Sequence, residues 1–107
     1  MTGSESEAEV SHPVDDSLRI LIADDHEPTR VGIRLALERA GLEVCYEASD
    51  AAGAVEGALL THPDGCLLDI NMPGSGIAAA AEICERAPEI AVVMLTVSHD
   101  EADLFAS

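Results

Sequence analysis

Short apolar runs alternate along this chain with segments whose apolar residues recur every three or four positions. We expect the apolar runs to form buried β-strands at Arg19–Ala23, Glu43–Ala48, Gly65–Asp69 and 90–96. The segments with helical spacing predict helices over 28–40, after Asp50, over 77–87 and from Ser98 onward. Because strands and helices alternate, the sequence predicts an α/β fold with a doubly wound parallel sheet and right-handed crossovers.

Composition limits the chain to one small domain. The 107 residues are 48% hydrophobic but include one Tyr, one Phe and no Trp, so the core must consist mainly of Ala, Val, Ile and Leu. Residues 1–17 are acidic and polar with almost nothing to pack, and we expect a disordered tail there. The folded domain is therefore expected over 18–107.

Charge and cysteine usage narrow the choice of partners and compartment. The formal net charge of −16 argues against binding to nucleic acid or to an anionic membrane surface. No apolar stretch approaches the roughly 20 residues that span a bilayer, and the N-terminus has no apolar segment for secretion, so a cytoplasmic protein is expected. Cys45, Cys66 and Cys84 lack a C-x-x-C spacing and are expected to be buried apolar residues.

Carboxylates follow two of the predicted strands directly. Asp24 and Asp25 come after the first strand, and Asp69 ends the third. If these strands are parallel neighbours, their carboxyl ends meet at the sheet edge where α/β proteins bind ligands. Three carboxylates in one place repel unless a divalent cation lies among them, which predicts a Mg²⁺ site and phosphoryl-transfer chemistry. Taken alone, Asp25 is better explained as a cap of the helix that begins at Pro28, whereas the three acids together favour the metal site.

The order of three motifs resembles one protein family. The motifs are Leu-Ile-Ala-Asp-Asp-His at 21–26, Leu-Leu-Asp-Ile-Asn-Met-Pro-Gly at 67–74 and Val-Val-Met-Leu-Thr at 92–96. Over 18–107 the chain resembles the receiver domain of bacterial two-component response regulators. The Asp-Asp-His motif and Leu-Thr-Val-Ser-His-Asp-Glu at 95–101 are most similar to the NarL/FixJ (LuxR-type) branch. The resemblance implies a flavodoxin-like (CheY-like) sheet with strand order 2-1-3-4.

The resemblance also implies a role for each site residue. Asp69 would accept a phosphoryl group from a phosphohistidine of a sensor histidine kinase. Asp25 and Asp69 would bind Mg²⁺ directly, Asp24 through water, and Asn71 through its backbone carbonyl. The Thr96 hydroxyl would bind the phosphoryl group and couple phosphorylation to a protein interface. Such a domain is a phosphoprotein switch in signal transduction rather than a turnover enzyme, and it would regulate transcription through a separate DNA-binding domain.

The chain also departs from the family pattern. Receiver domains continue through a fifth strand, which carries a Lys, and a fifth helix, whereas this sequence ends earlier and contains no Lys. We therefore expect a fragment or a truncated domain whose fourth strand is an uncovered hydrophobic edge. Such a segment is expected to be unstable alone, or to form a homo-oligomer through the fourth strand or the helix that follows it.

Two other functions remain open at this point. Without the Lys, the domain could be an interaction or dimerisation module that works without phosphorylation. A phosphohydrolase of the haloacid-dehalogenase type also uses an Asp nucleophile and Mg²⁺. That chemistry needs a second acid two residues after the nucleophile, where this chain has Asn71, so the hydrolase is the less favoured alternative.

Overall fold

A four-stranded sheet with three helices forms the described part of the chain, residues 17–96, in a computed structural model. In chain order the elements are β1 (Arg19–Ala23), α2 (Glu27–Arg39), β2 (Glu43–Ala48), α3 (Ala51–Thr61), β3 (Gly65–Asp69), α4 (Gly76–Arg86) and β4 (Ala91–Leu95). The first three predicted strands have the observed bounds, and the predicted fourth strand is one residue too long at each end. The predicted tail (apart from Ser17) and the predicted helix from Ser98 lie outside the described residues.

The sheet is parallel throughout, with strand order β2-β1-β3-β4. This confirms the 2-1-3-4 order that the family resemblance implied. β1 lies between β2 and β3, and it pairs with β3 from Ile20 opposite Gly65 to Ala23 opposite Leu68. The ends of β1 and β3 therefore reach the same edge of the sheet.

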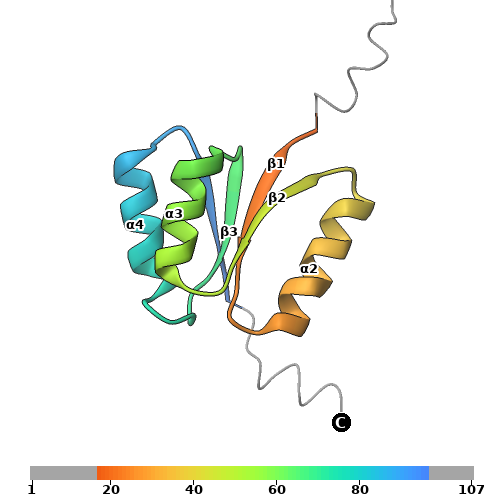
Figure 1. Cartoon of the computed structure of the whole chain (residues 1–107), viewed down its shortest axis with the longest axis horizontal. Coiled ribbons are helices and arrows are strands. Elements are labelled where there is room, and N and C mark those ends of the chain that lie inside the picture. The colour runs from red at the N-terminus through yellow and green to blue at the C-terminus, as the bar shows by residue number, and fades with distance from the viewer. Residues whose placement is uncertain (1–16, 97–107) are drawn as a thin grey trace, which may run out of the picture.

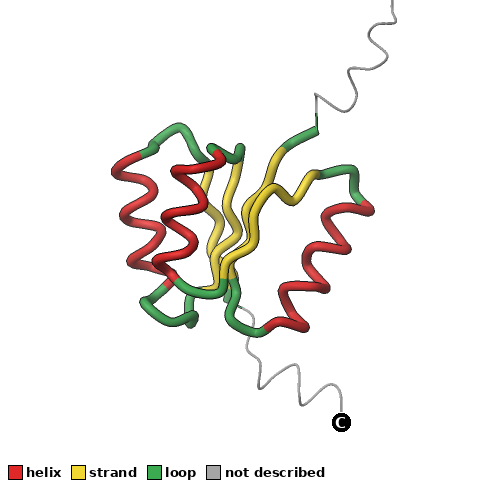
Figure 2. The backbone as a smooth tube through the Cα atoms, viewed as in Figure 1, coloured by secondary structure: helices red, strands yellow, loops and turns green. Residues whose placement is uncertain are grey.

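One face of the sheet carries the hydrophobic core. Figures 1 and 2 show α3 and α4 side by side on this face and α2 on the opposite face. Leu21, Cys66 and Leu68 from the sheet are fully buried, together with Ala54 and Ile83 from the two helices. The core consists mostly of Ala, Val, Ile and Leu, as the composition predicted.

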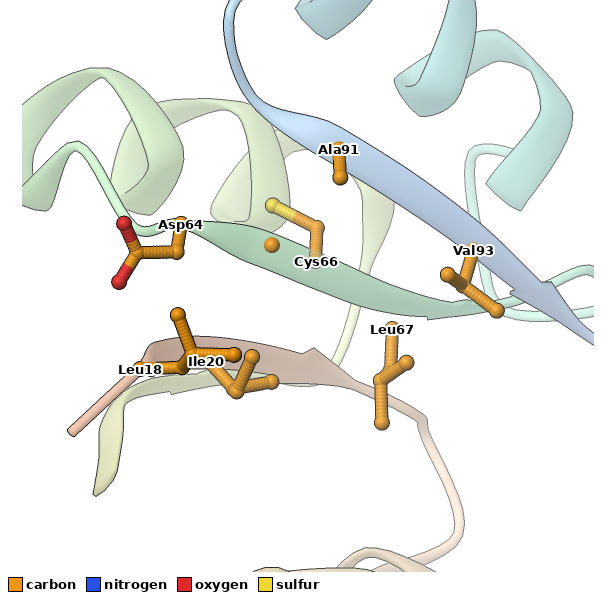
Figure 3. Close-up of a pocket in the computed structure, with 8 residues that line it drawn as sticks. Leu18, Ile20, Asp64, Cys66, Leu67, Ala91 and Val93 are labelled. Carbon is orange, nitrogen blue, oxygen red and sulfur yellow. The ribbon is translucent and has the colours of Figure 1, made fainter. Parts of the chain in front are cut away.

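The opposite face is only partly covered. α2 contacts β1 and β2 but has no buried residue of its own. Over β3 and β4 this face is an apolar hollow, lined in part by Ile20, Leu67 and Val93 (Figure 3). Val93 is 50% exposed. Within residues 17–96, β4 is also an outer strand of the sheet, as expected for the fourth strand.

The cysteines differ in their surroundings. Cys66 points to the α3–α4 side of β3, away from Leu67 (Figure 3), and burial raises the pKa of its thiol to about 12. Cys45 is half-buried, but Cys84 is exposed on α4. The expectation that all three are buried is therefore wrong for Cys84, because it lies on the solvent side of an amphipathic helix whose core-facing residues are Ala79 and Ile83.

No helix within 17–96 is long and apolar enough to cross a membrane.

A close contact between α3 and β2 depends on a glycine. A Cβ atom placed on Gly57 would overlap the ring of Tyr46. Gly57 is buried, and the Tyr46 ring packs against the core cluster. The helix needs a glycine here for space, although glycine disfavours helix formation.

We expect Gly57→Ala to lower the free energy of unfolding by about 1–3 kcal/mol, because the new methyl group must displace the Tyr46 ring. The matched control is Gly32→Ala in α2, where a Cβ atom meets nothing within 4 Å. Gly32→Ala should stabilise the protein by about 0.5–1 kcal/mol through helix propensity alone. Urea denaturation of both variants measures the difference, and equal effects of the two substitutions would contradict the close contact.

Candidate functional site

Three carboxylates meet at the carboxyl edge of the sheet. Asp24 and Asp25 follow β1, and Asp69 is the last residue of the neighbouring β3. One oxygen atom from each side chain lies within 4.8 Å of the others. Asp24 and Asp69 are each 2% exposed, while Asp25 is exposed to solvent. The structure therefore brings these three predicted residues together in a site that opens to solvent at Asp25.

The donor set of this acidic cluster fits a small divalent cation. Oxygen atoms bound to one Mg²⁺ at about 2.1 Å lie about 3 to 4 Å apart. The separation of up to 4.8 Å therefore requires only a small closing movement of the side chains. Two ionised carboxylates this far apart repel by roughly 3 kcal/mol at an effective dielectric constant near 20. A cation among them would remove that cost.

Asp24 is held by hydrogen bonds with residues of β2, of α2 and of the loop between β1 and α2. The Asp24 N–H donates to the Ala48 carbonyl at 3.0 Å, and Asp24 Oδ1 accepts from the His26 N–H at 2.8 Å. The Asp24 carbonyl accepts from Arg30 Nη1 at 2.7 Å. His26, not Asp25, is the N-cap residue of α2, and no side chain caps this helix. The interpretation of Asp25 as a helix cap is therefore wrong, because the helix begins one residue too late for it.

The loop after β3 wraps closely around Asp69. The Asn71 N–H donates to Asp69 Oδ1 at 3.1 Å, and the Gly76 N–H donates to the Ile70 carbonyl at 3.0 Å. A Cβ atom on Gly76 would overlap the Asp69 carbonyl. The helix predicted over 77–87 excludes Gly76, whereas α4 begins at this residue, and its close approach to Asp69 was not predicted. Its only signal in the sequence was a glycine at the start of a helix, where glycine is an ordinary choice.

Thr96 reaches the same edge from the next strand. β4 pairs with β3 so that Leu95 lies opposite Asp69, and Thr96 follows directly. Thr96 is exposed, and so is Asn71, two residues beyond Asp69. The topology thus places both predicted residues at the edge that carries the acidic cluster.

The family comparisons agree with this geometry. Residues 20–107 match the family of the response regulator receiver domain. The chain belongs to this family. The expected resemblance to receiver domains is therefore confirmed.

A curated relative matches most of this chain. The chain is 37% identical over 91 residues to the oxygen regulatory protein NreC of Staphylococcus epidermidis, a match that covers 82% of this chain and 42% of the relative. The chain thus spans less than half the length of this curated relative.

Solved structures of response regulators align with the described fold. A LuxR-family two-component response regulator from Aurantimonas sp. SI85-9A1 aligns with a TM-score of 0.71 and 30% identity, over 85% of this chain and 69% of that one. The signal receiver domain of the putative response regulator NarL from Mycobacterium tuberculosis aligns with a TM-score of 0.64 and 35% identity, over 73% and 63%. These matches confirm the NarL/LuxR-type branch and the receiver fold.

Gly76→Ala should displace the backbone of Asp69 in the acidic cluster. The added methyl group collides with the Asp69 backbone, so either α4 or the end of β3 must shift, and we expect a loss of about 1–3 kcal/mol in unfolding free energy. Gly65→Ala at the other end of β3 is the control, because its Cβ atom meets only ordinary contacts at 3.5 Å or more. Thermal melts compare the two, and a Gly76→Ala protein as stable as Gly65→Ala would refute the close approach.

Proposed function

We propose that this receiver domain is a phosphoacceptor switch in which Asp69 takes a phosphoryl group from a sensor histidine kinase. The observation that supports the proposal most strongly is the meeting of Asp24, Asp25 and Asp69, with oxygen atoms within 4.8 Å. The chain belongs to the receiver family. The resemblance to that family implies that the nucleophile is the Asp at the end of the third strand. The domain would act in the cytoplasm, where the kinase presents its phosphohistidine.

In the proposed reaction an Asp69 carboxylate oxygen attacks the phosphorus atom. The bond from phosphorus to the kinase histidine nitrogen breaks, its electron pair returns to the imidazole, and an acyl phosphate remains on Asp69. The Asn71 N–H, which donates to Asp69 Oδ1 at 3.1 Å, orients the carboxylate for this attack. The Thr96 hydroxyl would then donate a hydrogen bond to a phosphoryl oxygen and pull the end of β4 toward Asp69.

The metal ligands in this proposal are Asp25 and Asp69 directly, Asp24 through water, and the backbone carbonyl of Asn71. Bound Mg²⁺ would offset the negative charge that develops on the phosphoryl oxygens. Asp25 is exposed and is therefore open to an incoming phosphoryl donor, whereas buried Asp24 is held by hydrogen bonds with Ala48, His26 and Arg30. The two acids thus have different tasks, with Asp24 shaping the pocket and Asp25 meeting the cation and the donor.

The whole protein is proposed to regulate transcription through a further domain. One structural neighbour is RcsB from Salmonella enterica bound to promoter rprA, of which this chain covers 47% at 27% identity. The net charge of −16 fits a receiver that signals through protein contacts and leaves DNA binding to another domain.

A second candidate function is an interaction module that works without phosphorylation. It is favoured by the outer position of β4 within 17–96, because the residues of this strand are all apolar and Val93 is 50% exposed. Such a strand can pair with a second copy of the chain. The phosphohydrolase alternative is weaker, because Asn71 carries an amide where a proton donor is needed.

Phosphorylation is tested by incubating the 107-residue chain with Mg²⁺ and phosphoramidate and measuring its intact mass. The wild-type protein should gain one phosphoryl group, and Asp69→Asn should gain none because the amide is no nucleophile. Glu56→Gln on α3 is the charge control, since it removes an exposed carboxylate outside the cluster and should not change the gain.

Other outcomes of the same experiment separate the alternatives. No mass gain in the wild type, together with a dimer in sedimentation, would support the interaction module instead. Sustained release of phosphate from many substrates would support the hydrolase.

Mg²⁺ should raise the melting temperature of the wild-type chain, because the ion binds only where folding has brought the carboxylates together. At a Mg²⁺ concentration 100 times the dissociation constant, the free energy of unfolding should rise by about 2.7 kcal/mol. Asp25→Asn should lose most of this gain while Glu56→Gln keeps it, and chelation with EDTA should reverse it. An equal response to Mg²⁺ and to the same ionic strength of NaCl would argue against a specific site.

A further inference from the structure

Arg30 links the acidic loop to the neighbouring strand. The residue lies in the first turns of α2, and its side chain is 18% exposed. Nη1 donates to the Asp24 carbonyl at 2.7 Å, and Nε donates to Glu47 Oε1 on β2 at 3.1 Å. All five arginines of the chain are described, and Arg30 is the one whose side chain bonds a residue of the acidic cluster. We call this pair of contacts the Arg30 clamp.

The far end of the Arg30 clamp is well anchored. Glu47 lies in β2 opposite Ile22 of β1, so the sheet register fixes its backbone. Its second carboxylate oxygen accepts from Arg34 Nη1 at 3.2 Å. Because α2 has no buried residue, the two contacts of Arg30 contribute more to the position of this helix than they would in a well-packed helix. The clamp therefore connects helix, strand and loop on the face of the sheet that α2 covers only in part.

The near end of the Arg30 clamp acts on the peptide between two of the acids. The Asp24 carbonyl belongs to the peptide unit that continues into Asp25, so fixing that oxygen fixes the plane of the unit. The Asp24 side chain is oriented separately by the His26 N–H. Asp25 is exposed and follows directly on this peptide unit. The Arg30 contact thus fixes the peptide unit from which Asp25 extends.

We propose that Arg30 is a positioning residue that holds Asp25 where it can share a divalent cation with Asp24 and Asp69. This inference rests on the metal site in the proposed function and adds the residue that arranges it. Residues that hold metal ligands in place commonly change metal affinity by about 10- to 100-fold when they are replaced. The planar guanidinium suits the task, because it directs N–H groups from two nitrogen atoms in one rigid plane, whereas the N–H groups of an ammonium lie on one nitrogen and rotate.

Charge and geometry make opposite predictions for Arg30. A cation near a Mg²⁺ site repels the ion, so removing a charge that acted only through electrostatics would tighten binding. Removing a residue that positions Asp25 would weaken binding instead. The carboxylate of Glu47, 3.1 Å from Nε, already offsets much of the Arg30 charge. We therefore expect the geometric effect to dominate.

The test measures Mg²⁺ dissociation constants from backbone amide shifts in ¹H–¹⁵N NMR spectra of the 107-residue chain. Arg30→Gln should raise the constant about tenfold, and Arg30→Lys should also raise it although the charge is kept. Arg34→Gln is the matched control, because it removes the same charge from the same Glu47 without touching the Asp24 carbonyl. It should leave the constant within about twofold of wild type, since an exposed ion pair contributes little.

The outcomes separate this inference from the function on which it rests. Unchanged or tighter Mg²⁺ binding in Arg30→Gln, or equal weakening in Arg34→Gln, would overturn the positioning role while the metal site stands. A wild-type chain that binds no Mg²⁺ would overturn both. Melting curves without Mg²⁺ identify a variant that fails to fold. If Arg30→Gln does not fold, Arg30→Lys replaces it in the test, because it keeps the charge and most of the side-chain length. A dissociation constant for Mg²⁺ in Arg30→Lys equal to that of the wild type would then overturn the positioning role.

Discussion

The parallel pairing of β1 with β3 brings the ends of two strands from distant parts of the sequence to one edge. Ala23 lies opposite Leu68 in this ladder, so the acids that follow on each strand must lie close together. Folding therefore does work against electrostatic repulsion between the carboxylates. A cation among them would reduce that repulsion, so metal binding would stabilise the sheet.

The two faces of the sheet are held in different ways. On the α3–α4 face, small residues such as Ala54, Ala58 and Gly57 allow the helices to approach closely, and the core there is fully buried. On the other face α2 has no buried residue, and the polar contacts of Arg30 with Glu47 and the Asp24 carbonyl connect it to the sheet. The side of the site that faces α2 is thus shaped by directional polar bonds, and the Asp69 side by close packing at Gly76.

The sequence predicted well those features that depend on local patterns. Alternation and apolar runs located β1, β2 and β3, and the helix expected after Asp50 is α3, whose N-cap Asp50 accepts from the Gly53 N–H. The sequence did not predict the close approaches at Gly57 and Gly76 or the side-chain contacts of Arg30. Each of these contacts depends on which atoms of another segment lie next to the residue in the folded chain. The periodicity of one segment does not specify those atoms.

The sequence by itself determined the order of strands and helices, the composition of the core and the three acids that follow strand ends. These features rest on backbone periodicity and on where polar residues interrupt apolar runs. Tertiary structure alone decided that His26 and not Asp25 is the N-cap residue of α2, that Cys84 faces solvent, and that Arg30 binds the Asp24 carbonyl. The physical reason is that each strand or helix is specified by the periodicity of one segment, whereas side-chain contacts depend on the relative placement of two or three segments.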